Sequence, residues 1–481
     1  MSDNKRILSG LVWTIGEKFC SQLTHMVISI ILARLLVPEY YGVISITVVF
    51  INIAEVFITS GFGNALIQKK NADEEDYSSL FWLSLGISLV LYLVLFSIAP
   101  FISVFYGNKD LTAILRVMSL SVPISALNTI QRAHVSKQMR FRKFFFSTTV
   151  GTLISGAIGI AMAYSGCSIW ALVAQYLINI AVNTFVLWFT SGWTPKFIFN
   201  KDRVKPLFSY SWKLMLSQFL SKLTENIRSL IIGKVFSPTD LAYYDRGHAY
   251  PNKISNIINS SISLVMFPAA SSKQNDLKLM KTLAKRAISI CCLVMAPLLL
   301  SFAFCAESLV RIFLTETWLP CVPFLQIYCI FYLFVPVNTI NLQIIKAQGR
   351  SDLVLIIEFV KKIFEILVIL FTVFVCKSVL AIAIGSIISC LFSVVINTSI
   401  NRKIILYGFF EQIWDIIKTI IPSFIAVLIT YCITLNIASD ILRLVISFSM
   451  IFLIYILLLL VFDKGDVIYL FNMAKQFFVK K

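Results

Sequence analysis

Hydrophobic residues form long runs along the whole chain, and short polar segments separate these runs. A helix needs about 20 apolar residues to cross the hydrocarbon core of a bilayer. The pattern therefore predicts an all-α protein that crosses a membrane about fourteen times. The predicted spans lie near residues 10–33, 42–63, 78–103, 111–131, 144–165, 168–190, 207–232, 242–268, 287–313, 322–345, 353–375, 378–400, 416–436 and 441–462.

Two of these runs have a polar side. Plotted at 100° per residue, the polar residues of run 207–232 occupy one sector of about 100°: Gln218, Ser221, Lys222, Glu225 and Ser229. The run 10–33 has the equivalent residues Lys18, Ser21, Gln22, His25 and Ser29. A polar stripe on a lipid-embedded helix must face something other than lipid, so we expect both helices to line a hydrated cavity.

The two halves of the chain resemble each other at a separation of about 200 residues. The segment SQLT at 21–24 matches SKLT at 221–224, and Pro38 matches Pro238. Six spans, six more and two extra helices are predicted, with domains at 1–200, 201–403 and 404–481. Such parallel repeats are related by a pseudo-two-fold axis along the membrane normal, with a cavity between them.

Composition and charge support a membrane protein. Only 14% of the 481 residues are charged, against about 25% in soluble domains, and no polar block is long enough for a soluble domain. The net charge of +18 would suggest nucleic acid, but its distribution indicates topology instead. With a cytoplasmic N-terminus, 27 of the 42 Lys and Arg lie in cytoplasmic segments and 6 on the opposite side. Both termini are therefore predicted to be cytoplasmic.

Two basic cytoplasmic segments also contain apolar residues at helical spacing. Segment 271–288 has Leu277, Met280 and Ala284 among lysines, and segment 411–418 surrounds Trp414. We expect both to form helices that lie on the inner leaflet.

Ionisable residues within the predicted spans are the main functional signal. Each costs about 2.5–3.5 kcal/mol near the bilayer centre unless it is paired or hydrated. Lys222 with Glu225, and Glu225 with Arg228, have the spacing of paired neighbours on a helix. Basic residues outnumber acidic ones in the seventh and eighth spans, which favours an anionic ligand such as a phosphate.

The candidate residues fall into two groups. The candidates for lining the substrate cavity are Lys18, His25, Lys222, Glu225, Arg228, Arg246 and Lys253. The candidates for ion coupling, with H⁺ or Na⁺ left open, are Glu17, Glu55 and Asp245. The alternative interpretation is structural: interhelical ion pairs, or side chains that extend to the headgroups.

Signals of enzymatic chemistry are weak. The chain contains no G-x-x-x-x-G-K-[ST] motif and no C-x-x-C, and its three histidines are far apart. We therefore expect a transporter rather than an enzyme, with no cofactor and no metal site.

Several segments occur in the order found in one transporter family. They include ARLLVPEYYGVISI (33–46), GFGNALIQKK (61–70), IWALVAQ (169–175), LAYYDRG (241–247) and MFPAASSKQ (266–274). Over about the first 400 residues the chain resembles the Wzx-type polysaccharide exporters of the multidrug/oligosaccharidyl-lipid/polysaccharide exporter superfamily. Asp245 stands in YYDRG where Asn is expected, which indicates an added ion pair with Arg246 and questions a direct ligand role for Arg246.

The resemblance implies a MATE-like fold of two six-helix lobes in a V, followed by two further helices. It also implies flipping of an undecaprenyl-diphosphate-linked oligosaccharide across the bacterial cytoplasmic membrane, for lipopolysaccharide, capsule or exopolysaccharide, beside a polysaccharide polymerase. Two alternatives remain: a drug or cation exporter of the same superfamily, or an integral-membrane glycan polymerase or transferase.

Overall fold

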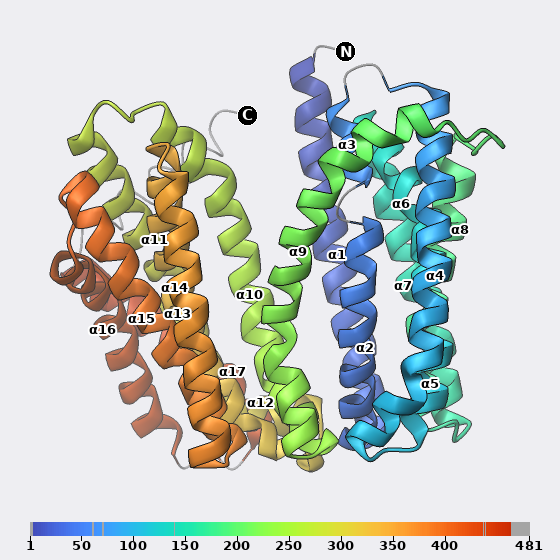
Figure 1. The fold of residues 1–481 in the computed structure, drawn as a ribbon. Helices are drawn as coiled ribbons and strands as arrows, with labels where there is room; N and C mark the ends of the chain where they lie inside the picture. Colours follow the sequence, from blue (N-terminus) through green and yellow to red (C-terminus); the bar gives the residue numbers. More distant parts are fainter. Residues whose placement is uncertain are drawn as a thin grey trace. The chain divides into compact units, whose positions relative to one another are not determined.

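The computed structural model describes residues 3–59, 62–69, 72–138, 140–435, 437 and 439–462, and every regular element in these ranges is helical. The chain forms two compact units, Met1–Ala242 and Tyr243–Lys481. The division falls inside a helix, so the boundaries expected at residues 200 and 403 stay predictions. Within each unit the long helices run side by side (Figure 1).

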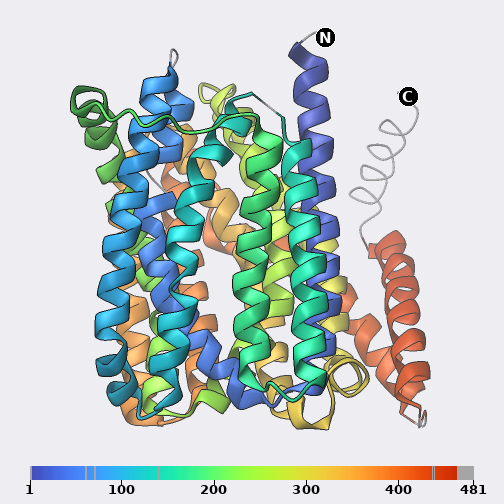
Figure 2. The same ribbon diagram turned by 90° about the vertical axis from the view of Figure 1, so that its right-hand side faces the viewer.

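The first unit is built around a helical hairpin, α7–α8, against which α1 packs (Figure 2). A second group contains α2, α4, α6 and α9, in which α2 and α4 each contact both α6 and α9. The helices of this unit are α1 (Asp3–Leu35), α2 (Pro38–Thr59), α3 (Phe62–Gln68), α4 (Glu74–Tyr106), α5 (Asp110–Met118), α6 (Ser121–Lys137), α7 (Arg142–Tyr164), α8 (Ile169–Ser191) and α9 (Lys201–Val235).

In the second unit, α11 packs against α13 and α16, while α13 packs against α15 and α16 against α17. The elements are α10 (Pro238–Ser271), α11 (Leu277–Phe304), α12 (Ala306–Phe313), α13 (Val322–Ala347), α14 (Ser351–Phe371), α15 (Val379–Ile405), α16 (Phe409–Thr434) and α17 (Asp440–Phe462). A short 3₁₀-helix, Glu316–Cys321, precedes α13, and a π-helical turn, Thr372–Cys376, follows α14.

Side-chain caps determine where several helices begin. At the start of α4, Asp73 accepts a hydrogen bond from the Asp76 backbone N–H at 3.0 Å, and the Asp76 carboxylate accepts one from the Asp73 N–H at 3.1 Å. This reciprocal capping box satisfies two backbone donors that the first turn cannot pair. Lys69 Nζ lies 2.6 Å from the fully buried Asp76 carboxylate, so the same residue also joins the end of α3 to α4.

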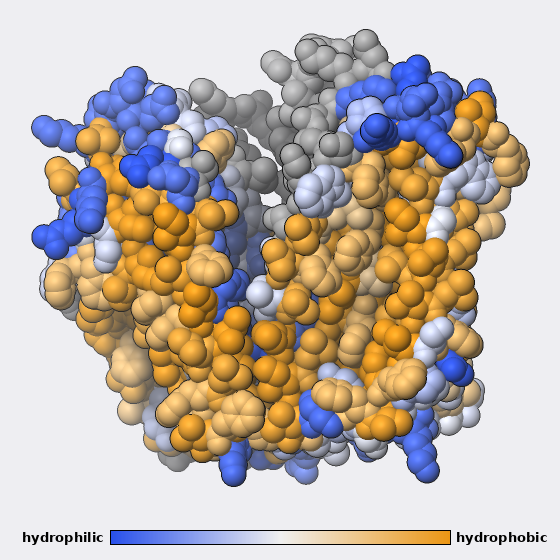
Figure 3. Space-filling view, viewed as in Figure 1, coloured by the Kyte–Doolittle hydropathy of each residue, from blue (hydrophilic) through white to orange (hydrophobic). Residues whose placement is uncertain are grey.

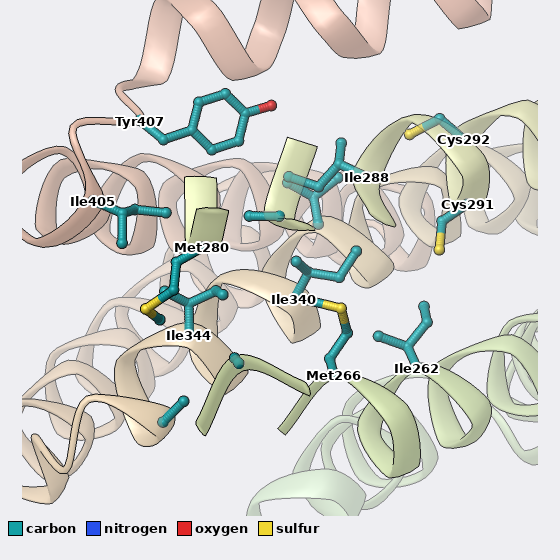
Figure 4. Close-up of a cluster of buried hydrophobic side chains, with 14 of the residues drawn as sticks. Ile262, Met266, Met280, Ile288, Cys291, Cys292, Ile340, Ile344, Ile405 and Tyr407 are labelled. Atoms are coloured by element: carbon teal, nitrogen blue, oxygen red, sulfur yellow. The ribbon is translucent and has the colours of Figure 1, made fainter. Parts of the chain in front are cut away.

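The core of the second unit corrects one prediction from the sequence. Met280, Ala284 and Ile288 are fully buried there against α13, together with Ile340 and Ile344 (Figure 4). Their segment forms the first turns of the continuous helix α11, and segment 411–418 likewise lies within α16. The prediction of helices lying on the inner leaflet is wrong, because both segments are parts of longer helices that are apolar enough to cross the membrane. In the first segment, Met280, Ala284 and Ile288 also pack into the protein.

Eleven helical segments of the described chain are long and apolar enough to cross a membrane, which confirms a polytopic membrane protein. On the face seen in Figure 3, hydrophobic residues cover the middle of each unit, and hydrophilic residues lie toward its ends. The fourteen-span count stays a prediction. Three long helices, α1, α9 and α14, are not among the eleven.

Helix α14 shows how such a polar helix is accommodated. Two ion pairs compensate four charges along the helix. Lys361 Nζ lies 3.1 Å from Glu358 Oε1, and Lys362 Nζ lies 2.9 Å from Glu365 Oε2. The Lys361 and Glu365 side chains are only 11% and 17% exposed, whereas apolar residues such as Phe359 lie on the exposed face. Each pair joins residues three positions apart, which lie on one face of the helix.

Candidate functional site

Helix α9 presents its polar stripe outside the packing of its own unit. The opposite side packs into the unit: Ile232 is fully buried, and Gly233 lies so close to α2 that a Cβ atom would be 2.9 Å from the Ile46 side chain. Within the stripe, Gln218, Ser221 and Glu225 are exposed. The stripe predicted from helical periodicity therefore exists as an exposed surface on α9.

The central feature of that stripe is an ion pair. Lys222 Nζ lies 2.7 Å from Glu225 Oε2, and the two side chains are 42% and 57% exposed. This contact confirms the pairing expected from their spacing. Arg228, one turn further along α9, is half-buried. Because the pair is exposed, its contribution to stability is at most about 1 kcal/mol, and both groups can exchange partners with a ligand at little cost.

Helix α1 is two-sided in the same way. Ile28 and Leu32 are buried against the α7–α8 hairpin, whereas Gln22 and His25 are exposed. The side chains of Glu17 and Lys18 lie outside the described residues. Of the candidate residues on α1, His25 is therefore the one whose exposure the structure describes.

Glu55, an ion-coupling candidate, lies inside the first unit on α2. Its Oε1 atom accepts a hydrogen bond of 2.7 Å from the Ser125 hydroxyl of α6. A carboxyl group that accepts from a neutral hydroxyl, away from the ends of its helix, is a group that can bind and release a proton.

The candidates on α10 have mixed environments. Arg246 is buried, and its guanidinium lies 4.8 Å from the ring centroid of Trp318, a cation–π contact within the second unit. Asp245 and Lys253 are half-buried. The position of Arg246 favours a structural role for this residue, in agreement with the doubt raised by Asp245 in the YYDRG segment.

A hydrogen-bonded aromatic cluster on α10 and α13 was missed by the sequence analysis. His248 Nε2 lies 2.7 Å from the Tyr332 hydroxyl, and the Tyr328 hydroxyl donates to that of Tyr244. Each helix contributes two residues separated by four positions, so each pair shares one helix face. That i,i+4 spacing of His and Tyr on two helices is the signal that could have identified the cluster. Two of its members, Tyr244 and His248, are each two positions from Arg246 in the sequence.

Comparison with known proteins places these features in a family. A family model described as "Polysaccharide biosynthesis protein" matches residues 31–323, more than half of the chain. The chain is 23% identical over 314 residues to the succinoglycan biosynthesis transport protein ExoT of Rhizobium meliloti. This match covers 65% of this chain and 64% of ExoT, which is just under two thirds of ExoT's length. It is also 23% identical over 355 residues to the teichuronic acid biosynthesis protein TuaB of Bacillus subtilis, covering 73% of each.

Among solved structures, the lipid II flippase MurJ in an inward closed conformation matches with a TM-score of 0.72 at 14% identity. The match covers 96% of this chain and all of the MurJ chain. At that identity the likeness shows a shared fold, and it confirms the polytopic all-helical architecture expected from the sequence.

Proposed function

Because the chain belongs to the polysaccharide biosynthesis protein family, we propose that it is a flippase for a lipid-linked oligosaccharide. Its substrate would be an undecaprenyl-diphosphate-linked repeat unit, moved from the cytoplasmic to the outer leaflet of a bacterial cytoplasmic membrane. The names of two relatives, a transport protein for succinoglycan and a protein of teichuronic acid synthesis, support export of a polysaccharide precursor. The fold shared with MurJ supports a flippase mechanism.

The observation on which the assignment of the site rests is the exposed stripe of α9. A helix that carries Lys222, Glu225 and Arg228 within about two turns is too polar to be surrounded by lipid. Glu225 is exposed, and Lys222 and Arg228 are half-buried. Ammonium and guanidinium groups bind phosphate oxygens through charge-assisted hydrogen bonds. In this proposal Lys222 exchanges Glu225 for the substrate diphosphate, and Arg228 binds the same group from the next turn, while His25 and Lys18 line the route.

The double variant Lys222→Ala with Arg228→Ala tests this assignment. We expect loss of surface glycan, measured by export of the polysaccharide in cells that depend on this protein, with normal membrane insertion. The matched control, Lys201→Ala with Lys205→Ala, removes the same charge from exposed positions on the first two turns of α9 and should export normally. Normal export by the Lys222/Arg228 variant would exclude the proposed site.

Purified protein in proteoliposomes separates the flippase from the alternatives. It should move a fluorescent undecaprenyl-diphosphate sugar between leaflets. Export of cationic drugs without flipping would indicate the drug exporter instead, and elongation of the glycan would indicate a polymerase.

We propose that Glu55 is a proton site coupled to transport. The variant Glu55→Gln keeps an acceptor for Ser125 but cannot lose a proton, so export should fall while the folded protein persists. Export should be normal in Ser125→Ala, which keeps the titrating group. Normal export by the Glu55→Gln variant would show that the Glu55 carboxylate has no role in coupling.

We also propose that both termini are cytoplasmic, because basic residues gather on that side. This orientation places Cys376, an exposed residue just after α14, outside the cell. A membrane-impermeant maleimide should label Cys376 in intact spheroplasts when the other exposed cysteine, Cys432, is replaced by Ala, and adding Cys376→Ala should remove that labelling. Labelling of Cys376 only after permeabilisation would reverse the orientation.

A further inference from the structure

A basic pocket lies within the second unit, near the first turns of α11 and α16. Its volume is about 360 Å³, and its lining includes Lys281, Lys285 and Arg286 from α11 with Lys418 and Asp415 from α16. None of these residues belongs to the site proposed for the transported substrate. The pocket therefore needs its own explanation.

Two of the lysines that line the pocket form ion pairs. Lys281 Nζ lies 2.8 Å from Glu411, and Lys285 Nζ lies 3.1 Å from Asp415. Four cationic side chains therefore gather at the pocket: Lys281, Lys285, Arg286 and Lys418. Ammonium and guanidinium groups gathered in one pocket can bind the oxygens of a phosphodiester, which carries one negative charge, through charge-assisted hydrogen bonds.

The one carboxylate that lines the pocket is fixed in place. Asp415 is buried, with its side chain 6% exposed, and it accepts a hydrogen bond of 2.8 Å from the Tyr407 hydroxyl. Burial raises the pKa of Tyr407, so this hydroxyl remains a donor at physiological pH. The Asp415 carboxylate binds both the Tyr407 hydroxyl and the Lys285 ammonium group. Asp415 therefore holds Lys285 beside the pocket.

The surface beside the pocket is suited to lipid. Along α16, exposed apolar residues recur at three- and four-residue spacing, which places them on one face of the helix: Phe410, Trp414, Ile417, Ile421, Phe424 and Leu428. Lys418 lies next to this face, and its Nζ is 5.7 Å from the ring centroid of Trp414. Aromatic residues followed by an aliphatic strip mark the transition from headgroups to acyl chains.

From these observations we propose that the pocket binds the phosphate of an anionic phospholipid, whose acyl chains lie along the exposed apolar face of α16. Arg286, Lys285 and Lys418 hold the phosphate oxygens, and the lipid fills the space between the first turns of α11 and α16. With the orientation proposed above, the site faces the cytoplasmic leaflet, where basic pockets between helices meet anionic headgroups. The site is independent of the transported substrate.

The test uses the purified full chain in neutral detergent, titrated with phosphatidylglycerol or phosphatidylcholine. Binding is measured by native mass spectrometry and by the rise in Tm. The test variant is Arg286→Ala with Lys418→Ala, since both residues are exposed and Asp415 keeps its partners. Losing two cations should weaken binding of phosphatidylglycerol about 30-fold, and the Tm without lipid should stay within a few degrees of the wild type.

The matched control, Lys278→Ala with Lys403→Ala, removes two exposed positive charges that do not line the pocket. It should bind phosphatidylglycerol as the wild type does. Equal loss in the control would show general surface attraction and overturn the proposal, as would full binding by the Arg286/Lys418 variant. Inorganic phosphate forms a separate arm, and an equal rise in Tm with phosphate alone would show a free-anion site rather than a lipid site.

Discussion

A buried amide network in the second unit permits a quantitative prediction. Asn341 of α13 is fully buried and donates to Gln412 Oε1 of α16 at 2.8 Å. Its own Oδ1 accepts from Gln412 Nε2 at 3.1 Å and from Asn401 Nδ2 of α15 at 2.6 Å. These three hydrogen bonds connect three helices inside a membrane protein, where exchange with water is unavailable.

The substitution Asn341→Leu removes all three bonds while nearly conserving volume. Interhelical hydrogen bonds in membranes average about 0.6 kcal/mol each, with a maximum near 1.7, so the expected loss of unfolding free energy is about 2–4 kcal/mol. Gln412→Leu should cost a similar amount. The double variant should cost at least about 1 kcal/mol less than the sum of the two, because the bonds between these residues would otherwise be counted twice.

The measurement is reversible unfolding in mixed micelles, with the free energy obtained from the denaturing detergent titration. The control Asn256→Leu removes an exposed amide whose hydrogen bond, 2.6 Å to Asn252, is within one helix, and it should change the free energy by less than about 0.5 kcal/mol. Strict additivity of Asn341→Leu and Gln412→Leu would refute the reasoning, because it would show that their mutual bonds contribute no stability.

Two further predictions concern packing and a buried charge. In Gly247→Ala the new Cβ would lie 2.5 Å from Phe324 Cβ, so α10 and α13 must move apart. The Tm should fall by the equivalent of about 1–3 kcal/mol of unfolding free energy. The control Gly86→Ala, whose new Cβ would have no atom within 4 Å, should leave the Tm unchanged or higher. An unchanged Tm for Gly247→Ala would show that the helices do not approach this closely. Asp76→Asn leaves Lys69 without its buried carboxylate and weakens the cap of α4, so it should cost about 1–3 kcal/mol in the same unfolding assay. Wild-type stability of that variant would show that the pair contributes nothing.

Much of this protein follows from one-dimensional properties of the chain. Membrane insertion depends on the summed transfer energy of about 20 consecutive residues, so hydropathy alone predicted a polytopic helical protein. The exposed stripe on α9 also follows from local geometry, because residues three and four apart share a face of any helix. The ion pair between Lys222 and Glu225 is such a local contact, and it was predicted correctly.

The tertiary structure decided which partner each face of a helix meets. Met280, Ala284 and Ile288 have a spacing that suits a membrane surface and a protein core equally, and only their packing against α13 shows that they belong to the core. The amide network joins Asn341 to residues 60 and 71 positions away, and the basic pocket joins Lys285 to Asp415, more than 100 positions away. No local rule brings such residues together. Hydropathy measures how strongly a residue avoids water, whereas the identity of its neighbours is set by the packing of whole helices, which depends on all of their side chains at once.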